Sequence, residues 1–258
     1  MNVLVSNDDG VDGEGLKALV AGLAKRHKVY VLAPDTNRSA ASNHFSLFMK
    51  PLKIKKVAEN VYSCSGTPVD CVITALTSPL FDVKFDVVVS GINKGQNVGR
   101  DIVYSGTCAA ARQAVFEGLP GIAASVFCED WSEEGQKNLH FEAMAEFVSK
   151  NLSQLIKLCE LSKRPSFVNI NGDSLTSYKG VKYTSTLCVK DYDDKVSLKK
   201  TDDGFETVFV DALTSPDYEA DSDYELCKEG YIAVSKVIAD SVSKEVSPDF
   251  IKDLNLSL

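Results

Sequence analysis

The feature that most constrains this chain is an alternation of short apolar runs with helical patterns along its first two thirds. Apolar runs lie at 3–5, 29–33 and 87–89. Runs without interspersed polar residues are typical of strands that are covered on both faces. Between the first two runs, the apolar residues of segment 16–23 recur at the spacing of one helical face. This alternation predicts an α/β fold with a doubly wound, mostly parallel sheet.

Further elements follow from local signals. The run Thr67-Pro68-Val69-Asp70 combines an N-cap residue, a proline at the first helical position and an acidic first turn, so it predicts the start of a helix. A long helix is predicted from about Gly135 to Leu161. Further strands are predicted at 61–64, 122–126 and 167–170.

The pattern changes after residue 175. Extended runs lie at 196–198, 205–210 and 231–237. The first two flank Thr201-Asp202-Asp203-Gly204, a hairpin signal because Asp-Gly tolerates positive φ. We expect the acidic stretch 217–223 to be a solvated loop and Ser247-Pro248-Asp249 to begin a short final helix. The chain is therefore predicted to form an α/β core over residues 1–175 and a smaller antiparallel C-terminal extension over residues 176–258.

Charge and cysteine content restrict the classes of partner. The chain has 28 basic and 36 acidic residues, a net charge of −8 that repels a phosphate backbone, so we expect no nucleic-acid partner. A small phosphorylated ligand remains compatible if a metal or backbone N–H groups supply local positive potential. The seven cysteines form no CxxC pair, and no stretch reaches the ~18–20 apolar residues of a membrane span. We expect a cytoplasmic protein that does not enter a membrane.

Two adjacent carboxylates, Asp8 and Asp9, directly follow the first predicted strand. Neighbouring carboxylates repel each other unless a cation neutralises them, and Mg²⁺ or Mn²⁺ prefers oxygen ligands. Ser39 and Asn93 follow two other predicted strands, and the carboxyl ends of parallel strands share one edge of the sheet. These four residues therefore form a candidate metal site. From the residues alone, an Asx turn at 8–9 and ordinary turn roles for Ser39 and Asn93 remain open.

A glycine-spaced loop, Gly91–Gly99, precedes Ser105-Gly106-Thr107 at the start of a predicted helix. The unpaired N–H groups of a first helical turn favour an anion, which indicates a phosphate site. A simple N-cap role for Ser105 or Thr107 is the alternative. The loop has neither GxGxxG nor P-loop spacing, and the chain lacks a GxSxG nucleophile elbow.

Four segments, 3–10, 33–43, 66–72 and 90–107, together resemble the SurE family of metal-dependent nucleoside monophosphate phosphatases. The last, Ser-Gly-Ile-Asn-Lys-Gly-Gln-Asn-Val-Gly-Arg-Asp-Ile-Val-Tyr-Ser-Gly-Thr, is the most specific. Order and spacing match over roughly residues 1–125. The resemblance implies a Rossmann-like core and hydrolysis of nucleoside 5′- and 3′-monophosphates.

The resemblance also implies site residues and an assembly. It implies one Mg²⁺ or Mn²⁺ per subunit, held by Asp8, Asp9, Ser39 and Asn93, with the two aspartates catalytic. It implies phosphate-binding roles for Asn43, Asn97, Ser105, Gly106 and Thr107. Family members form homodimers or homotetramers that exchange a C-terminal arm. The alternatives are a phosphatase for short polyphosphate or sugar phosphates, and a non-catalytic nucleotide-binding regulator on the same fold.

Overall fold

The computed structural model describes residues 1–258 except 129, 131, 161–163, 190–194, 211–218 and 241–258. Its strands are β1 (Asn2–Ser6), β2 (Lys28–Pro34), β3 (Ile54–Ala58), β4 (Val61–Cys64), β5 (Val87–Lys94), β6 (Gly121–Val126), β7 (Ser166–Gly172), β8 (Val181–Tyr183), β9 (Lys195–Lys200), β10 (Phe205–Val210) and β11 (Ile232–Ile238). Its helices are α1 (Glu14–Ala24), α2 (Pro68–Thr77), α3 (Asp101–Tyr104), α4 (Gly106–Phe116), α5 (Glu133–Lys137), α6 (Glu142–Glu160) and α7 (Asp223–Lys228). Among the described residues, no helix combines the length and apolar content that a membrane span requires.

Nine strands form one sheet in the order β3-β4-β2-β1-β5-β6-β7-β11-β8. The six strands from β4 to β7 pair in parallel. Counted along the chain, these six have the order 3-2-1-4-5-6 of the dinucleotide-binding Rossmann sheet. Antiparallel pairing occurs where β3 joins β4 and where β11 joins β7. The predicted doubly wound, mostly parallel α/β fold is confirmed.

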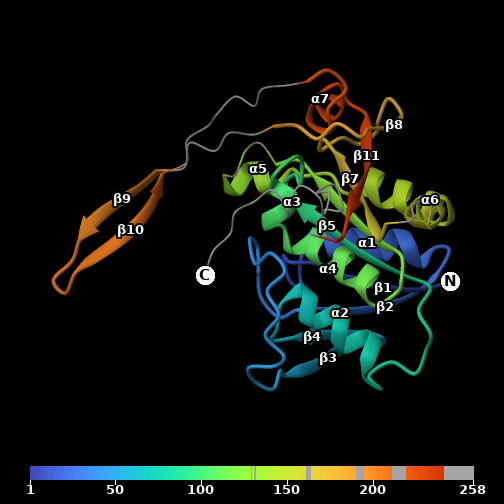
Figure 1. Ribbon diagram of the computed structural model, residues 1–258, viewed down its shortest axis with the longest axis horizontal. Helices are drawn as coiled ribbons and strands as arrows, with labels where there is room; N and C mark the ends of the chain where they lie inside the picture. The colour runs from blue at the N-terminus through green and yellow to red at the C-terminus, as the bar shows by residue number, and fades with distance from the viewer. Residues whose placement is uncertain (129, 131, 161–163, 190–194, 211–218, 241–258) are drawn as a thin grey trace, which may run out of the picture.

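Helices cover both faces of this sheet (Figure 1). On one face, Val3 and Val5 of β1 share an apolar cluster with residues of α1 and α6. On the other face, Leu4 shares a cluster with residues of α2 and α4. Neighbouring residues of β1 therefore serve opposite layers, as strand geometry requires. This double burial explains why the predicted strands are apolar at successive positions.

The strand order reverses at β1, because the chain first moves outward through β2 and β4 and then returns to β5 on the other side. Ligands of open α/β sheets bind at such switch points. The topology therefore predicts a ligand site among the residues that follow β1, β2 and β5.

The helix start predicted at Thr67 is confirmed. Thr67 is the N-cap of α2, and Thr67 and Asp70 form a reciprocal capping box with Pro68 in the first turn. The single helix predicted from Gly135 to Leu161 is wrong at its amino-terminal end. Ser132 caps the short helix α5, which ends before Asn138, and α6 begins only at Glu142.

The last third of the chain contributes to two sheets. β8 and β11 extend the main sheet, whereas β9 and β10 pair with each other as the hairpin predicted around Asp203-Gly204. In Figure 1 this hairpin, in orange, lies away from the main sheet. The helix predicted at 247–249 lies outside the described residues, as do residues 217 and 218 of the acidic stretch.

Candidate metal and phosphate site

Backbone contacts bring the three predicted segments together at the switch point. The N–H of Arg38 donates to the carbonyl oxygen of Asp8 at 2.6 Å, which places the residue before Ser39 against the end of β1. The N–H of Lys94 donates to Oδ2 of Asp9 at 3.1 Å, which places the residue after Asn93 against the same turn. Each candidate ligand from β2 and β5 is thus one residue from a direct contact with the aspartate pair.

Asp8 is buried and held at the amino-terminal end of α4. Its Oδ1 accepts the Thr107 hydroxyl at 2.6 Å, and its Oδ2 accepts the Thr107 backbone N–H at 3.1 Å. A Cβ on Gly106 would lie 2.9 Å from Asp8 Oδ2, so only glycine allows this close approach. Burial raises the pKa of Asp8, although the hydrogen bonds from Thr107 and the N–H of Gly106 act in the opposite direction.

Asp9 and Asn93 each have a side-chain oxygen that accepts no hydrogen bond from the described residues. Burial and, next, the charge of Asp8 raise the pKa of Asp9 to about 6. The β5–β6 register shifts between Ser90 and Asn93, at the end of the strand. Asn93 is buried and donates its Nδ2 to the carbonyl oxygen of Gly95 at 2.8 Å. Within the described part of the chain, no group donates to Asp9 Oδ1, to Asn93 Oδ1 or to the exposed Ser39 hydroxyl.

This donor set fits a hard divalent cation. It offers two carboxylates, an amide oxygen and a hydroxyl, the oxygen ligands that Mg²⁺ and Mn²⁺ prefer. The buried carboxylate of Asp8 and the half-buried carboxylate of Asp9 destabilise each other when both are ionised, and a cation between them removes that cost. The described residues hold no cluster of three or more His, Cys, Asp or Glu side chains suited to a metal. A site with only two acidic ligands is consistent with that finding.

The five residues predicted around the phosphate have different surroundings. Ser105 is the N-cap of α4, with its hydroxyl accepting the N–H of Cys108 at 3.0 Å. Gly106 and Thr107 contact Asp8, as described above. Asn43 is exposed, and its Oδ1 accepts an N–H of the Arg112 guanidinium at 2.6 Å.

Asn97, the fifth, belongs to a buried polar network that sequence reasoning missed. Its Nδ2 donates to the Ser125 hydroxyl at 2.8 Å, and its N–H donates to Oδ1 of Asn171 at 2.8 Å. Asn169 and Asn171 both donate to its carbonyl oxygen. Two asparagines within an otherwise apolar strand, β7, were the sequence signal for this network.

A second buried acid supports the same loop from the far end of the chain. Asp223, expected in a solvated loop, is instead the first residue of α7 and is buried. Its carboxylate accepts the N–H of Gly99 at 2.9 Å and that of Cys188 at 2.8 Å. The expectation of a loop was wrong at this position because Ser222 is the N-cap of α7 and its hydroxyl accepts the N–H of Glu225. The high density of acidic residues around Ser222 had favoured a solvated loop over a helix start.

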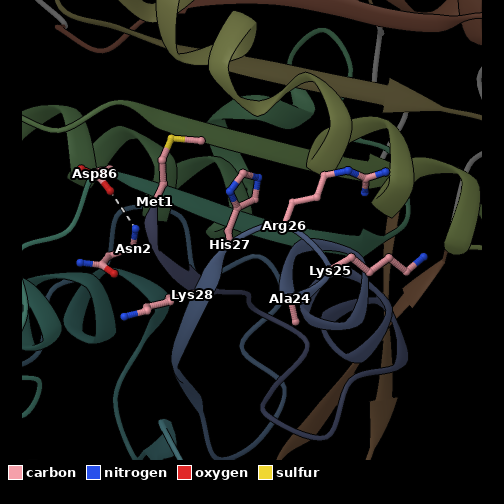
Figure 2. Close-up of a pocket in the computed structure, with 8 residues that line it drawn as sticks. All are labelled: Met1, Asn2, Ala24, Lys25, Arg26, His27, Lys28 and Asp86. Carbon is pink, nitrogen blue, oxygen red and sulfur yellow. Dashed lines mark hydrogen bonds between the residues drawn. The ribbon is translucent and has the colours of Figure 1, made fainter.

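A different pocket lies at the opposite edge of the sheet, where β1 and β2 begin (Figure 2). It has a volume of about 440 Å³, and Asn2, Arg26, Lys28 and Asp86 are among the residues that line it. The side chains of Arg26 and Lys28 point in different directions, and Arg26 is already paired with Glu146 at 2.6 Å. Asp86 is likewise occupied, because its Oδ2 accepts the N–H of Asn2 at 2.7 Å. We therefore do not regard this pocket as the active site.

Comparison with known proteins supports the resemblance. The profile of the family described as "Survival protein SurE" matches residues 3–192. The chain is 45% identical over 181 residues to "5'-nucleotidase SurE" of Treponema pallidum, a match covering 69% of this chain and 93% of that protein. It is 34% identical over 251 residues to "5'-nucleotidase SurE" of Campylobacter jejuni, covering 94% of this chain and 93% of that protein.

The fold shows the same similarity. The crystal structure of a SurE protein from Aquifex aeolicus superposes with a TM-score of 0.81 at 30% sequence identity, covering 98% of this chain and 100% of the other. The similarity therefore extends beyond residues 1–125, where the sequence motifs are concentrated, to nearly the whole chain. On this agreement of profile, sequence and fold, the chain belongs to the SurE family.

Proposed function

We propose that this protein is a metal-dependent phosphomonoesterase that hydrolyses nucleoside 5′- and 3′-monophosphates to nucleoside and phosphate. The observation that carries the proposal is the convergence of Asp8, Asp9 and the segments bearing Ser39 and Asn93 at the switch point. Two relatives that align with this chain over 93% of their own length carry the name 5'-nucleotidase SurE. Their name supports the reaction class.

We assign Asp8, Asp9, Ser39 and Asn93 as ligands of one Mg²⁺ or Mn²⁺ per subunit. Such an ion, when bound, neutralises charge on the phosphoryl group and lowers the pKa of a coordinated water. Thr107 fixes the orientation of Asp8 through two hydrogen bonds, so the carboxylate is positioned before substrate arrives. The Asp8–Asp9 pair accepts the proton of the attacking water.

The phosphate is proposed to lie against Asn43, Asn97, Ser105, Gly106 and Thr107. Arg112 occupies the oxygen of Asn43, which leaves the Nδ2 of Asn43 as the donor for a phosphate oxygen. Asn97 uses one N–H of its amide on Ser125 and keeps a second. The first turn of α4 adds the positive end of a helix dipole.

Substitution of the aspartates tests the reaction. Asp8→Asn and Asp9→Asn are expected to lower the kcat for AMP hydrolysis with Mn²⁺ by about 10²–10⁴-fold, the range for loss of a proton acceptor. Asp12→Asn is the matched control, because Asp12 follows in the same turn and its side chain is 90% exposed. Chelation should abolish turnover, and Mn²⁺ or Mg²⁺ should restore it. Full activity in either aspartate variant would contradict the role of Asp8 and Asp9 as metal ligands. Absence of phosphate release by the wild type would favour the alternative, a non-catalytic nucleotide-binding regulator on the same fold.

We further propose a cytoplasmic homodimer or homotetramer in which the C-terminal region makes subunit contacts. All seven cysteines are free and buried, which suits a reducing compartment. On the hairpin, Val196, Leu198 and Phe205 are 59%, 64% and 66% exposed, apolar surface that a single chain leaves uncovered. Light scattering should report two or four subunits, and Leu198→Glu should reduce that number. A monomeric wild type would contradict the assembly.

A further inference from the structure

A second cavity adjoins the loop that carries Ser39, and we call it the lysine pocket. It has a volume of about 430 Å³, and its lining includes Lys50, Lys53 and Lys55 together with Asp35 and Ser65. Lys55 pairs with Ser63, which also lines the pocket, across the β3–β4 ladder. The next residue along β3 points to the opposite face of the strand, since side chains alternate.

The positive charge of the lysine pocket is not neutralised by neighbouring acids. Among the described residues, Lys50, Lys53 and Lys55 form no ion pair. The acidic residue of the lining, Asp35, is paired with Arg38 at 3.2 Å. Three free ammonium groups on a chain of net charge −8 form a local positive potential that attracts an anion.

Arg38 links the lysine pocket to the candidate metal site. Its N–H donates to the carbonyl oxygen of Asp8, while its Nη2 donates to Asp35 Oδ1 and to the carbonyl oxygen of Ser65, each at 3.2 Å. Its Nε is buried and has no partner within the described part of the chain. One arginine therefore spans the distance from Asp8 to the pocket wall and keeps a donor unused.

We propose that the lysine pocket binds a second phosphate group, carried by the same nucleotide whose first phosphate lies at the Asp8–Asp9 site. The class of ligand is a nucleoside 3′,5′-bisphosphate, which presents two separate phosphate groups on one ribose. Lysines suit this task because each is a point charge on a flexible stem, able to follow a mobile phosphate. The inference rests on the proposed function for the position of the first phosphate.

Protection of a sheet edge is the competing role for these lysines. β3 is an edge strand, and lysines on edge strands hinder association of sheets. That role predicts that the protein self-associates when the lysines are removed. It also predicts no change in the affinity for any nucleotide. The two roles therefore differ in what substitution does to ligand binding.

The test compares AMP with adenosine 3′,5′-bisphosphate in the Mn²⁺-loaded full-length protein. We expect the wild type to show a KM about tenfold lower for the bisphosphate. The double variant Lys53→Ala/Lys55→Ala should raise that KM about tenfold, the effect of two exposed ion pairs, and leave the KM for AMP within about twofold. Lys56→Ala, a neighbouring exposed lysine outside the pocket lining, should match the wild type.

A binding measurement separates this inference from the proposed function. Calorimetric titration of EDTA-treated protein with the bisphosphate should show a Kd about tenfold weaker in the double variant than in the wild type. If the wild type fails to hydrolyse AMP, the proposed function fails and this titration alone decides the lysine pocket. Equal effects of the double variant on both substrates, or no effect on either, would overturn the inference. The inference would also be overturned if inorganic phosphate bound more tightly than the bisphosphate and the double variant abolished that binding of inorganic phosphate.

Discussion

Replacing Asp9 by asparagine is expected to stabilise the metal-free protein. Burial and, next, the charge of Asp8 raise the pKa of Asp9 from 3.8 to about 6. A carboxyl group with a raised folded-state pKa binds its proton more tightly in the folded than in the unfolded chain. Its contribution to stability is therefore favourable at low pH and is lost as pH rises from about 4 to about 6. Asparagine stays neutral and can still accept the N–H of Lys94.

The magnitude follows from the shift of about two pKa units. Each unit corresponds to about 1.4 kcal/mol, so ionised Asp9 costs the folded protein about 3 kcal/mol at pH 8. At pH 4.5, Asp9 is mostly ionised in the unfolded chain and mostly protonated in the folded one. Its cost to the folded protein is then about 1 kcal/mol. The Asp9→Asn variant should therefore gain about 3 kcal/mol of unfolding free energy at pH 8 and about 1 kcal/mol at pH 4.5.

Urea unfolding of EDTA-treated protein at the two pH values measures these gains. Asp12→Asn, an exposed change in the same turn, should shift the unfolding free energy by less than about 0.5 kcal/mol at either pH. A loss of stability in Asp9→Asn at pH 8, or an equal gain at both pH values, would refute the electrostatic reasoning. Added Mn²⁺ should stabilise the wild type and leave Asp9→Asn unchanged.

Three further substitutions probe the supports of the site. Thr107→Val removes the hydroxyl that donates to Asp8, so it should cost about 1–3 kcal/mol in urea unfolding and lower kcat, whereas Thr107→Ser should restore both. Asp70→Asn should cost about 1–3 kcal/mol by the same measurement, because Asp70 accepts the N–H and the hydroxyl of Ser46; an unchanged midpoint would contradict this. Gly106→Ala should weaken Mn²⁺ affinity in calorimetry, because the added methyl group displaces the carboxylate of Asp8, and an unaltered Kd would count against it.

The strand ends that carry the candidate site could be predicted because they depend on local patterns. The apolar runs that became β1, β2 and β5 fixed where strands end, and the rule that parallel strands end at one edge then grouped Asp8, Ser39 and Asn93. The capping signal of Thr67-Pro68 was similarly local. The strand ends and the helix cap need only neighbouring residues to form, so their sequence signals are complete. The grouping itself comes from the order of strands in the sheet, since Asp9 and Lys94 are in contact across 85 positions.

Features that depend on distant partners could not be predicted. Asn97 forms its network with residues of β6 and β7, and Asn171 lies 74 positions away in the sequence. Asp223 contacts Gly99 across 124 positions. The break between α5 and α6 also involves a distant contact, because the N–H of His140 donates to the hydroxyl of Ser174. No local pattern encodes which of many polar side chains will meet across such separations.

Direct titration of metal is the most immediate test of the central claim that side chains from three strand ends share one cation. Calorimetry of the EDTA-treated protein with Mn²⁺ should give one ion per chain in the wild type. Asn93→Ala should weaken that binding, and Asp8→Asn should abolish it. Unchanged Mn²⁺ affinity and stoichiometry in both variants would show that these residues do not hold the ion.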